Sequence, residues 1–190
     1  MVRAEDAIQI YHSLSAAGIQ VWLTGGWGID ALLQKQTRPH KDLDILMEVD
    51  DAVPMRNLLR QAGYSLKGLW SENVWVLDTQ GTEIPTAFVL QDSEGSKVDA
   101  HATWLDGSGR ATPAWASEGL IFSREDLAGE GTISGFAVRC ISPQTQLRCH
   151  MSYDLPPEQV RDVELLRAQF GVESPQEQPN EAQAAHRGNA

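Results

Sequence analysis

Two aspartates separated by one residue are the most chemically informative feature of this sequence. Asp42 and Asp44 lie in a segment, 42–48, in which acidic and apolar residues alternate as in a β-strand. Side chains two residues apart in a strand point to the same face, so these carboxylates are expected side by side, roughly 6–7 Å apart. Such carboxylates repel each other unless a cation lies between them, and magnesium prefers oxygen ligands. The pair therefore predicts a magnesium site.

A third carboxylate, from another strand, would complete a site for two magnesium ions. Asp99 is the preferred candidate, because it lies within 97–101 among small and apolar residues, as in a central strand. Asp78 and Asp92 are alternatives, but both belong to turn-like segments, where aspartates are usually solvated. His101 is interpreted as a packing residue on the opposite face of the strand from Asp99.

A glycine pair indicates where phosphate groups would bind. Gly25 and Gly26 follow an apolar run, 19–23, and precede apolar residues at helical spacing. Glycines let backbone amides approach a phosphate, and the positive N-terminus of the following helix attracts anions. Thr24 offers a hydroxyl at the same place. The Walker phosphate loop and the dinucleotide fingerprint are both absent, so neither of those nucleotide-binding classes applies.

A polar loop, 34–41, joins the glycine turn to the acidic strand and carries three basic residues. Arg38 is expected to hold a triphosphate by paired hydrogen bonds, although a solvated basic loop is the alternative. His40 is expected to orient this loop rather than contact the substrate. Asp30, in the preceding helix, is expected to brace it.

The periodicity of apolar residues predicts the elements that must position these groups. It predicts helices at 4–17, 51–62 and two more after position 142, with strands at 19–23, 42–48, 73–78, 84–90, 97–101 and 136–141. We expect an α+β fold, a mixed sheet backed by helices. Residues 1–141 are expected to form the core, 142–172 a helical C-terminal part packed on it, and 173–190 a disordered tail.

Composition limits the classes of partner. The chain has 190 residues and a formal net charge of −11, so it should repel a nucleic-acid backbone and attract a cationic small molecule. The N-terminus has no apolar segment of signal-peptide length, and no run approaches a membrane span. Together with only two cysteines, this favours a cytoplasmic protein without a membrane partner, as a monomer or homodimer.

Aromatic and histidine side chains are the candidates for an acceptor site. The chain has six tryptophans, of which Trp70, Trp75 and Trp104 fall where an acceptor cleft would form, although each alone is more simply a core residue. His150 and Tyr153 either line that cleft or serve packing and capping.

The order strand, Gly-Gly, helix, loop and Asp-x-Asp strand resembles the DNA polymerase beta-like nucleotidyltransferases. The blocks 22–30, 37–44 and 98–101 look like those of LinA-type lincosamide nucleotidyltransferases, with aminoglycoside 2''-nucleotidyltransferases next. A C-terminal block from Ile141 to Asp162 is similar as well. After the Asp-x-His block the sequence reads Ala102-Thr103-Trp104, where the lincosamide enzymes tend to have an apolar residue, so the acceptor region departs from the pattern.

This resemblance implies a mechanism. Two magnesium ions would bind Asp42, Asp44 and Asp99 with a nucleoside triphosphate, such as ATP, and a drug hydroxyl would attack the α-phosphorus with release of pyrophosphate. Asp99 would serve as metal ligand, general base or both. The leading acceptor is a lincosamide and the second an aminoglycoside. A protein- or tRNA-modifying nucleotidyltransferase and a non-catalytic nucleotide-binding regulatory module are the alternatives.

Overall fold

A mixed β-sheet forms the centre of the molecule in the computed structural model, which describes residues 1–117, 119–150 and 155–173. Within these residues the sheet has eight strands. Its order is β3 (Ser65–Leu69), β6 (Ala87–Gln91), β7 (Lys97–Leu105), β2 (Asp42–Glu48), β1 (Val21–Leu23), β10 (Phe136–Cys140) and β9 (Gly129–Ile133), and β8 (Ala111–Pro113) pairs with β7. The pairs β2–β7 and β1–β10 are parallel and the others antiparallel, which confirms the predicted mixed sheet.

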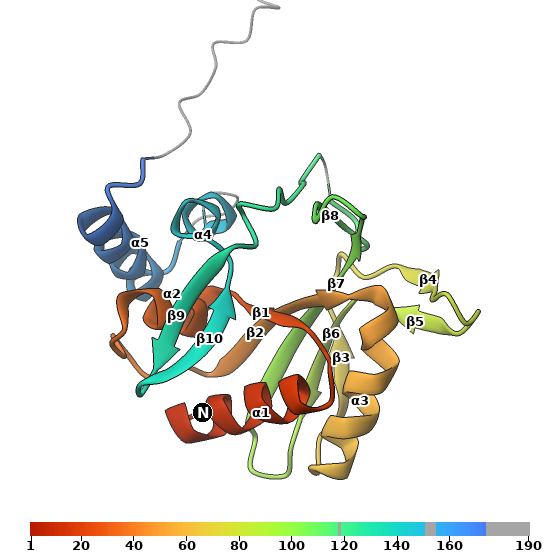
Figure 1. Cartoon of the computed structure of the whole chain (residues 1–190). Coiled ribbons are helices and arrows are strands. Elements are labelled where there is room, and N and C mark those ends of the chain that lie inside the picture. Colours follow the sequence, from red (N-terminus) through yellow and green to blue (C-terminus); the bar gives the residue numbers. More distant parts are fainter. Residues whose placement is uncertain (118, 151–154, 174–190) are drawn as a thin grey trace, which may run out of the picture.

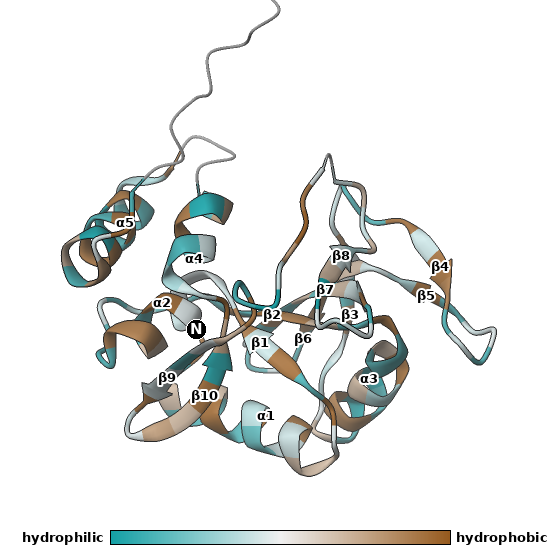
Figure 2. Cartoon of the chain, turned by 45° about the horizontal axis from the view of Figure 1, so that its top comes forward, coloured by the Kyte–Doolittle hydropathy of each residue, from teal (hydrophilic) through white to brown (hydrophobic). Residues whose placement is uncertain are grey.

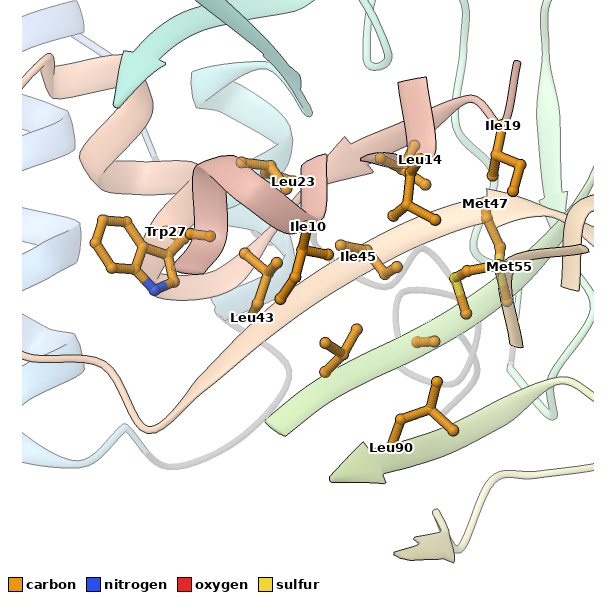
Figure 3. Packing of buried hydrophobic residues seen from close by; sticks show 14 of the residues in the cluster. Ile10, Leu14, Ile19, Leu23, Trp27, Leu43, Ile45, Met47, Met55 and Leu90 are labelled. Carbon is orange, nitrogen blue, oxygen red and sulfur yellow. The ribbon is translucent and has the colours of Figure 1, made fainter. Parts of the chain in front are cut away.

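Two helices, α1 (Ala4–Ala16) and α3 (Ala52–Gln61), cover one face of the sheet (Figure 1). The alternation in β2 explains why they pack there. Leu43, Ile45 and Met47 are fully or almost fully buried and point together toward this helical layer (Figure 3). The 3-10 turn η1 (Val49–Asp51) leads from β2 into α3. The same alternation leaves Asp42 and Asp44 on the opposite face.

That opposite face is covered by irregular chain. Trp22 and Leu46 belong to a second apolar cluster with Phe122 and Ile141, which draws the segment after β8 over the sheet. The Trp22 indole Nε1 donates a hydrogen bond of 2.8 Å to the carbonyl oxygen of Leu127. The helices α2 (Gly25–Leu33), α4 (Pro143–His150) and α5 (Pro157–Phe170) pack together near β9 and β10.

A separate hairpin, β4 (Trp75–Leu77) and β5 (Glu83–Pro85), projects from the body and carries exposed hydrophobic residues (Figure 2). The prediction of one strand over 84–90 was therefore wrong, because β5 and β6 belong to different sheets. The chain changes partner at Thr86, whose N–H binds Asn73 Oδ1 at 2.9 Å.

The strands β3, β8 and β9 were not predicted. In β9, apolar alternation is hidden by two glycines that the packing requires: a Cβ on Gly129 would overlap backbone atoms of β10, and one on Gly131 would overlap the backbone at Ala31. β3 lies at an edge of the sheet and is mostly exposed, so its sequence carries little apolar pattern.

Helices of the described residues are too short or too polar to cross a membrane. The predicted tail, 173–190, lies outside the described residues except for Glu173, and Tyr153 also lies outside them.

Candidate active site

The parallel pairing of β2 with β7 brings the predicted acids together. Asp44 and Asp99 are direct Cα partners on neighbouring strands, which lie roughly 4.8 Å apart. Asp42 pairs with Lys97 one side-chain repeat earlier on the same face. All three carboxylates therefore gather on the face opposite α1 and α3.

Burial and mutual repulsion raise the pKa values of two of these carboxylates. Removal of water raises the pKa of Asp44 well above its usual value; the charges of Asp42 and Asp99 add to the effect, and Arg38 opposes it. Burial, then the charge of Asp42, raises the pKa of Asp99 to about 6, against the opposing effect of Lys97. Asp99 Oδ1 is buried without a hydrogen-bond partner. An orphaned carboxylate oxygen in a group of like charges fits the donor set that magnesium prefers.

The alternative candidates for the third acid, Asp78 and Asp92, each stabilise a turn. The Asp78 carboxylate accepts two backbone N–H groups of its own turn, at 2.9 and 2.7 Å. Asp92 does the same, at 2.9 and 2.8 Å. Both are turn residues away from β2, so Asp99 is the acid that the fold brings to the pair.

The glycine turn fits closely around its neighbours. Gly25 has a φ of +56°, and a Cβ there would overlap the Asp44 carboxylate. A Cβ on Gly26 would overlap the imidazole of His40. Thr24 is the N-cap of α2, yet its side chain makes no capping hydrogen bond. Glycine is therefore required at both positions to leave room for the Asp44 and His40 side chains, in addition to any room it leaves for a ligand.

The basic loop is held from both of its sides. Arg38 donates from Nε and Nη2 to Asp162 Oδ2 in α5, at 2.9 and 2.8 Å, and Asp162 is 1% exposed. His40 Nε2 pairs with Asp30, which also accepts the Thr37 hydroxyl at 2.6 Å. Asp30 and His40 thus brace the loop, as expected, and Arg38 is not part of a loosely solvated segment.

A cleft of about 970 Å³ opens over this site. The polar residues just described and Lys41 line it beside the acids, and apolar residues of the second cluster line it around Leu46, together with Glu72 and His101. The cleft lining includes Thr24, Gly25, Gly26, Arg38, Lys41, Asp42, Asp44, Leu46, Glu72, His101, Trp115, Leu120, Phe122, Ile141, Arg148, His150 and Glu158. The sheet floor, the segment after β8, α4 and the start of α5 all contribute.

The interpretation of His101 was wrong. Residues 99 and 101 are two apart in β7 and so share a face, and His101 lines the cleft. Its Nε2 lies 3.1 Å from Glu72 Oε1, and its ring packs edge-on against Trp115 with the centroids 4.9 Å apart.

The tryptophans predicted for the core or the acceptor region are neither buried nor part of the cleft lining. Trp70, Trp75 and Trp104 are 40–53% exposed and do not line the cleft. Trp115 lines the cleft instead, but it stands in a Gly-, Ser- and Ala-rich segment that carries no periodic signal. His150 lines the cleft, and its Nδ1 lies 2.8 Å from the carbonyl oxygen of Gln146.

Comparison with known proteins identifies the family of this chain. The family model for aminoglycoside-2''-adenylyltransferase matches residues 6–166. The chain belongs to this family. It is therefore a nucleotidyltransferase, and the predicted family resemblance is confirmed.

Relatives of this adenylyltransferase-family chain include a lincosamide resistance protein of Staphylococcus haemolyticus, 28% identical over 150 residues, which are 79% of this chain and 85% of the relative. The lincomycin-bound crystal structure of the lincosamide antibiotic adenylyltransferase LnuA has a TM-score of 0.73 and 26% identity over 88% of this chain and 98% of that one. ANT(2'')-Ia in complex with adenylyl-2''-tobramycin shares the fold, with a TM-score of 0.65 and 17% identity over 88% and 89% of the two chains.

Proposed function

We propose that this chain transfers AMP from ATP to a hydroxyl of a lincosamide antibiotic and releases pyrophosphate. The observation that carries the proposal is the meeting of Asp42, Asp44 and Asp99 on one sheet face, under a cleft with a polar end and an apolar end. The polar end suits a triphosphate and the apolar end suits the acceptor.

Asp42, Asp44 and Asp99 would hold Mg²⁺, of which two ions are expected. Within the described residues, no three His, Cys, Asp or Glu side chains already form a metal cluster. Magnesium commonly takes only one or two carboxylates from the protein and completes its shell with substrate phosphates and water. When bound, the ions would neutralise charge on the phosphates and on the attacking oxygen. The unpartnered Asp99 Oδ1 and the raised pKa values support this assignment.

The glycine turn and its neighbours would hold the triphosphate. Gly25 and Gly26 offer backbone at the start of α2, and Thr24 offers a hydroxyl that is not used for capping. Arg38 lies at the same end of the cleft, with Asp162 fixing one side of its guanidinium group. These groups would place the α-phosphorus near the acids, so catalysis rests mainly on positioning and electrostatic stabilisation.

The proposed transfer forms one phosphorus–oxygen bond, breaks another and moves one proton. The acceptor oxygen forms a bond to the α-phosphorus while the bond to the bridging oxygen of pyrophosphate breaks. The hydroxyl proton would pass to Asp99, whose buried Oδ1 has no hydrogen-bond partner.

A lincosamide is the leading acceptor because the relative of 28% identity is a lincosamide resistance protein and LnuA is a lincosamide adenylyltransferase. The apolar lining of the acceptor end agrees with this choice. An aminoglycoside is the second candidate, favoured by the family model. The net charge of −11 disfavours tRNA, and a regulatory module would not need the three gathered carboxylates.

An acceptor panel tests the proposal. The protein is mixed with Mg²⁺, ATP and a set of lincosamides and aminoglycosides, and pyrophosphate release is measured. We expect release with lincomycin, and its loss in Asp44→Asn with the circular dichroism spectrum unchanged. Release by Asp44→Asn at the wild-type rate would refute the metal assignment, and no release with any acceptor or nucleotide would favour the regulatory module.

A further inference from the structure

Three side chains form a contact group at the acceptor end of the cleft. Glu72 Oε1 lies 3.1 Å from His101 Nε2, and the His101 ring packs edge-on against Trp115. The backbone joins them as well, because the Ala116 N–H donates to the Glu72 carbonyl oxygen at 2.8 Å. All three side chains line the cleft.

The strand register sets the distance between this contact group and the acids Asp44 and Asp99. His101 follows Asp99 by two residues on the same face of β7 and pairs with Leu46, two residues after Asp44. One such repeat spans roughly 7 Å along a strand. A sugar-sized acceptor whose hydroxyl lies at the acids would therefore reach this group with its remaining substituents.

Glu72 is charged at neutral pH. Burial acts to raise its pKa, but hydrogen bonds from His101, its own backbone and Ser71 outweigh this, and the pKa lies below the usual value. The side chain is 33% exposed, and a carboxylate has about four acceptor sites, so His101 and Ser71 leave capacity for a further donor. Among the described residues, four carboxylates line the cleft: Asp42 and Asp44 of β2, Glu72 and Glu158. Glu158 lies at the start of α5.

We propose that Glu72 binds the protonated amine of the acceptor, with His101 holding its carboxylate in place and Trp115 packing beside the amine. This inference rests on the proposed function and specifies its acceptor site. Much of the surrounding wall is apolar, through Leu46, Leu120, Phe122 and Ile141, and the cationic Arg148 in the lining is paired with Asp126 at 3.1 Å. One carboxylate beside an apolar wall fits an acceptor with a single amine and an apolar part better than it fits a polyamine.

The competing explanation is that Glu72 only fastens the segment that carries Trp115. Glu72→Gln separates the two roles, because glutamine keeps an acceptor for His101 and leaves the backbone bond to Ala116 intact while it removes the charge. Glu83→Gln is the matched control, since it removes the same charge from the projecting β4–β5 hairpin, where Glu83 is exposed and outside the cleft.

The experiment measures binding of lincomycin, which carries one basic amine, to the full chain by calorimetry with Mg²⁺ and a nonhydrolysable ATP analogue. We expect Glu72→Gln to raise the Kd for lincomycin about 10- to 100-fold, the value of a charge-assisted hydrogen bond. The Kd for the ATP analogue should stay within twofold of wild type. Glu83→Gln should bind both ligands as wild type does, and Glu72→Asp should lose less than Glu72→Gln.

Each other result overturns the inference. Equal lincomycin affinity in Glu72→Gln and Glu83→Gln would remove the amine contact, and parallel weakening of lincomycin and the ATP analogue would indicate a structural clamp. Tobramycin, a polyamine, serves as a second probe, and absence of binding of both probes by wild type would also refute the proposal. Failure of the proposed function is recognised separately, as absence of pyrophosphate release by wild type whatever the binding ratio.

Discussion

At the scale of single residues, the gathered carboxylates of the site repel one another. Asp44 and Asp99 are direct neighbours across β2 and β7, and both have raised pKa values. A carboxyl group whose pKa is higher in the folded than in the unfolded state binds more protons when folded, between the two values. Its contribution to stability is therefore present below the unfolded pKa and is lost as the pH rises through the folded pKa.

This predicts a pH effect on the metal-free protein. The pKa of Asp99 rises from 3.8 to about 6, so its contribution should fall by about 2 kcal/mol between pH 4 and pH 6. Urea unfolding in EDTA should show Asp99→Asn gaining stability over wild type across that window, and Mg²⁺ with ATP should reduce the difference at pH 7. A difference that does not change with pH would contradict the assignment.

The glycine turn gives a second prediction at this scale. Gly25→Ala should abolish nucleotide binding and destabilise the fold, because the new Cβ would overlap the Asp44 carboxylate and the φ of +56° is unfavourable for alanine. Gly81→Ala is the matched control: its φ is +79° but nothing lies within 4 Å, so it should cost only about 1 kcal/mol. Calorimetric titration with an ATP analogue and urea unfolding compare the two. Wild-type nucleotide affinity in Gly25→Ala would contradict the close fit.

At the scale of elements, α5 acts on the nucleotide end through one ion pair. Asp162 is almost fully buried, and Arg38 is 23% exposed at the cleft. The helix therefore orients the guanidinium group while leaving part of it accessible to a phosphate.

We expect Asp162→Asn to raise the KM for ATP about tenfold and to lower the free energy of unfolding by about 1–3 kcal/mol, with little change in the KM for the acceptor. Glu164→Gln, an exposed position on the same helix, is the control. A double-mutant cycle with Arg38→Gln should show that the two effects on ATP are not additive. Additive effects would indicate that the pair does not position Arg38.

Local sequence patterns predicted some of the helices and strands and missed others. The strand β2 and the helices α1 and α3 were predicted closely, because each has a regular apolar face. The strand β9 was missed because Gly129 and Gly131 replace apolar residues where the backbones of β10 and α2 approach. The 84–90 segment was predicted as one strand although Pro85 and Thr86 interrupt its apolar run, and the chain changes sheet at that point.

At the scale of the whole molecule, the net charge of −11 favours cationic acceptors and opposes ATP. Raising the salt concentration from about 0.05 to 0.5 M should therefore lower kcat/KM for lincomycin or tobramycin several-fold, because the Debye length shortens to a few ångströms. The KM for ATP at saturating Mg²⁺ should not rise in parallel. Initial rates of pyrophosphate release test this, and an equal salt effect on both substrates would exclude steering by the net charge.

The sequence by itself predicted the glycine turn, the acidic strand and Asp99 as the third carboxylate. Each of these depends on residues close together in the chain or on local periodicity. Because strand side chains alternate with a period of two, His101 lies on the same face as Asp99. The prediction that it lies on the opposite face applied this period wrongly. Only the tertiary structure decided that Asp44 faces Asp99, that Glu72 meets His101 across 29 residues and that Asp162 meets Arg38 across 124. Those contacts depend on strand register and helix docking, which no local pattern encodes.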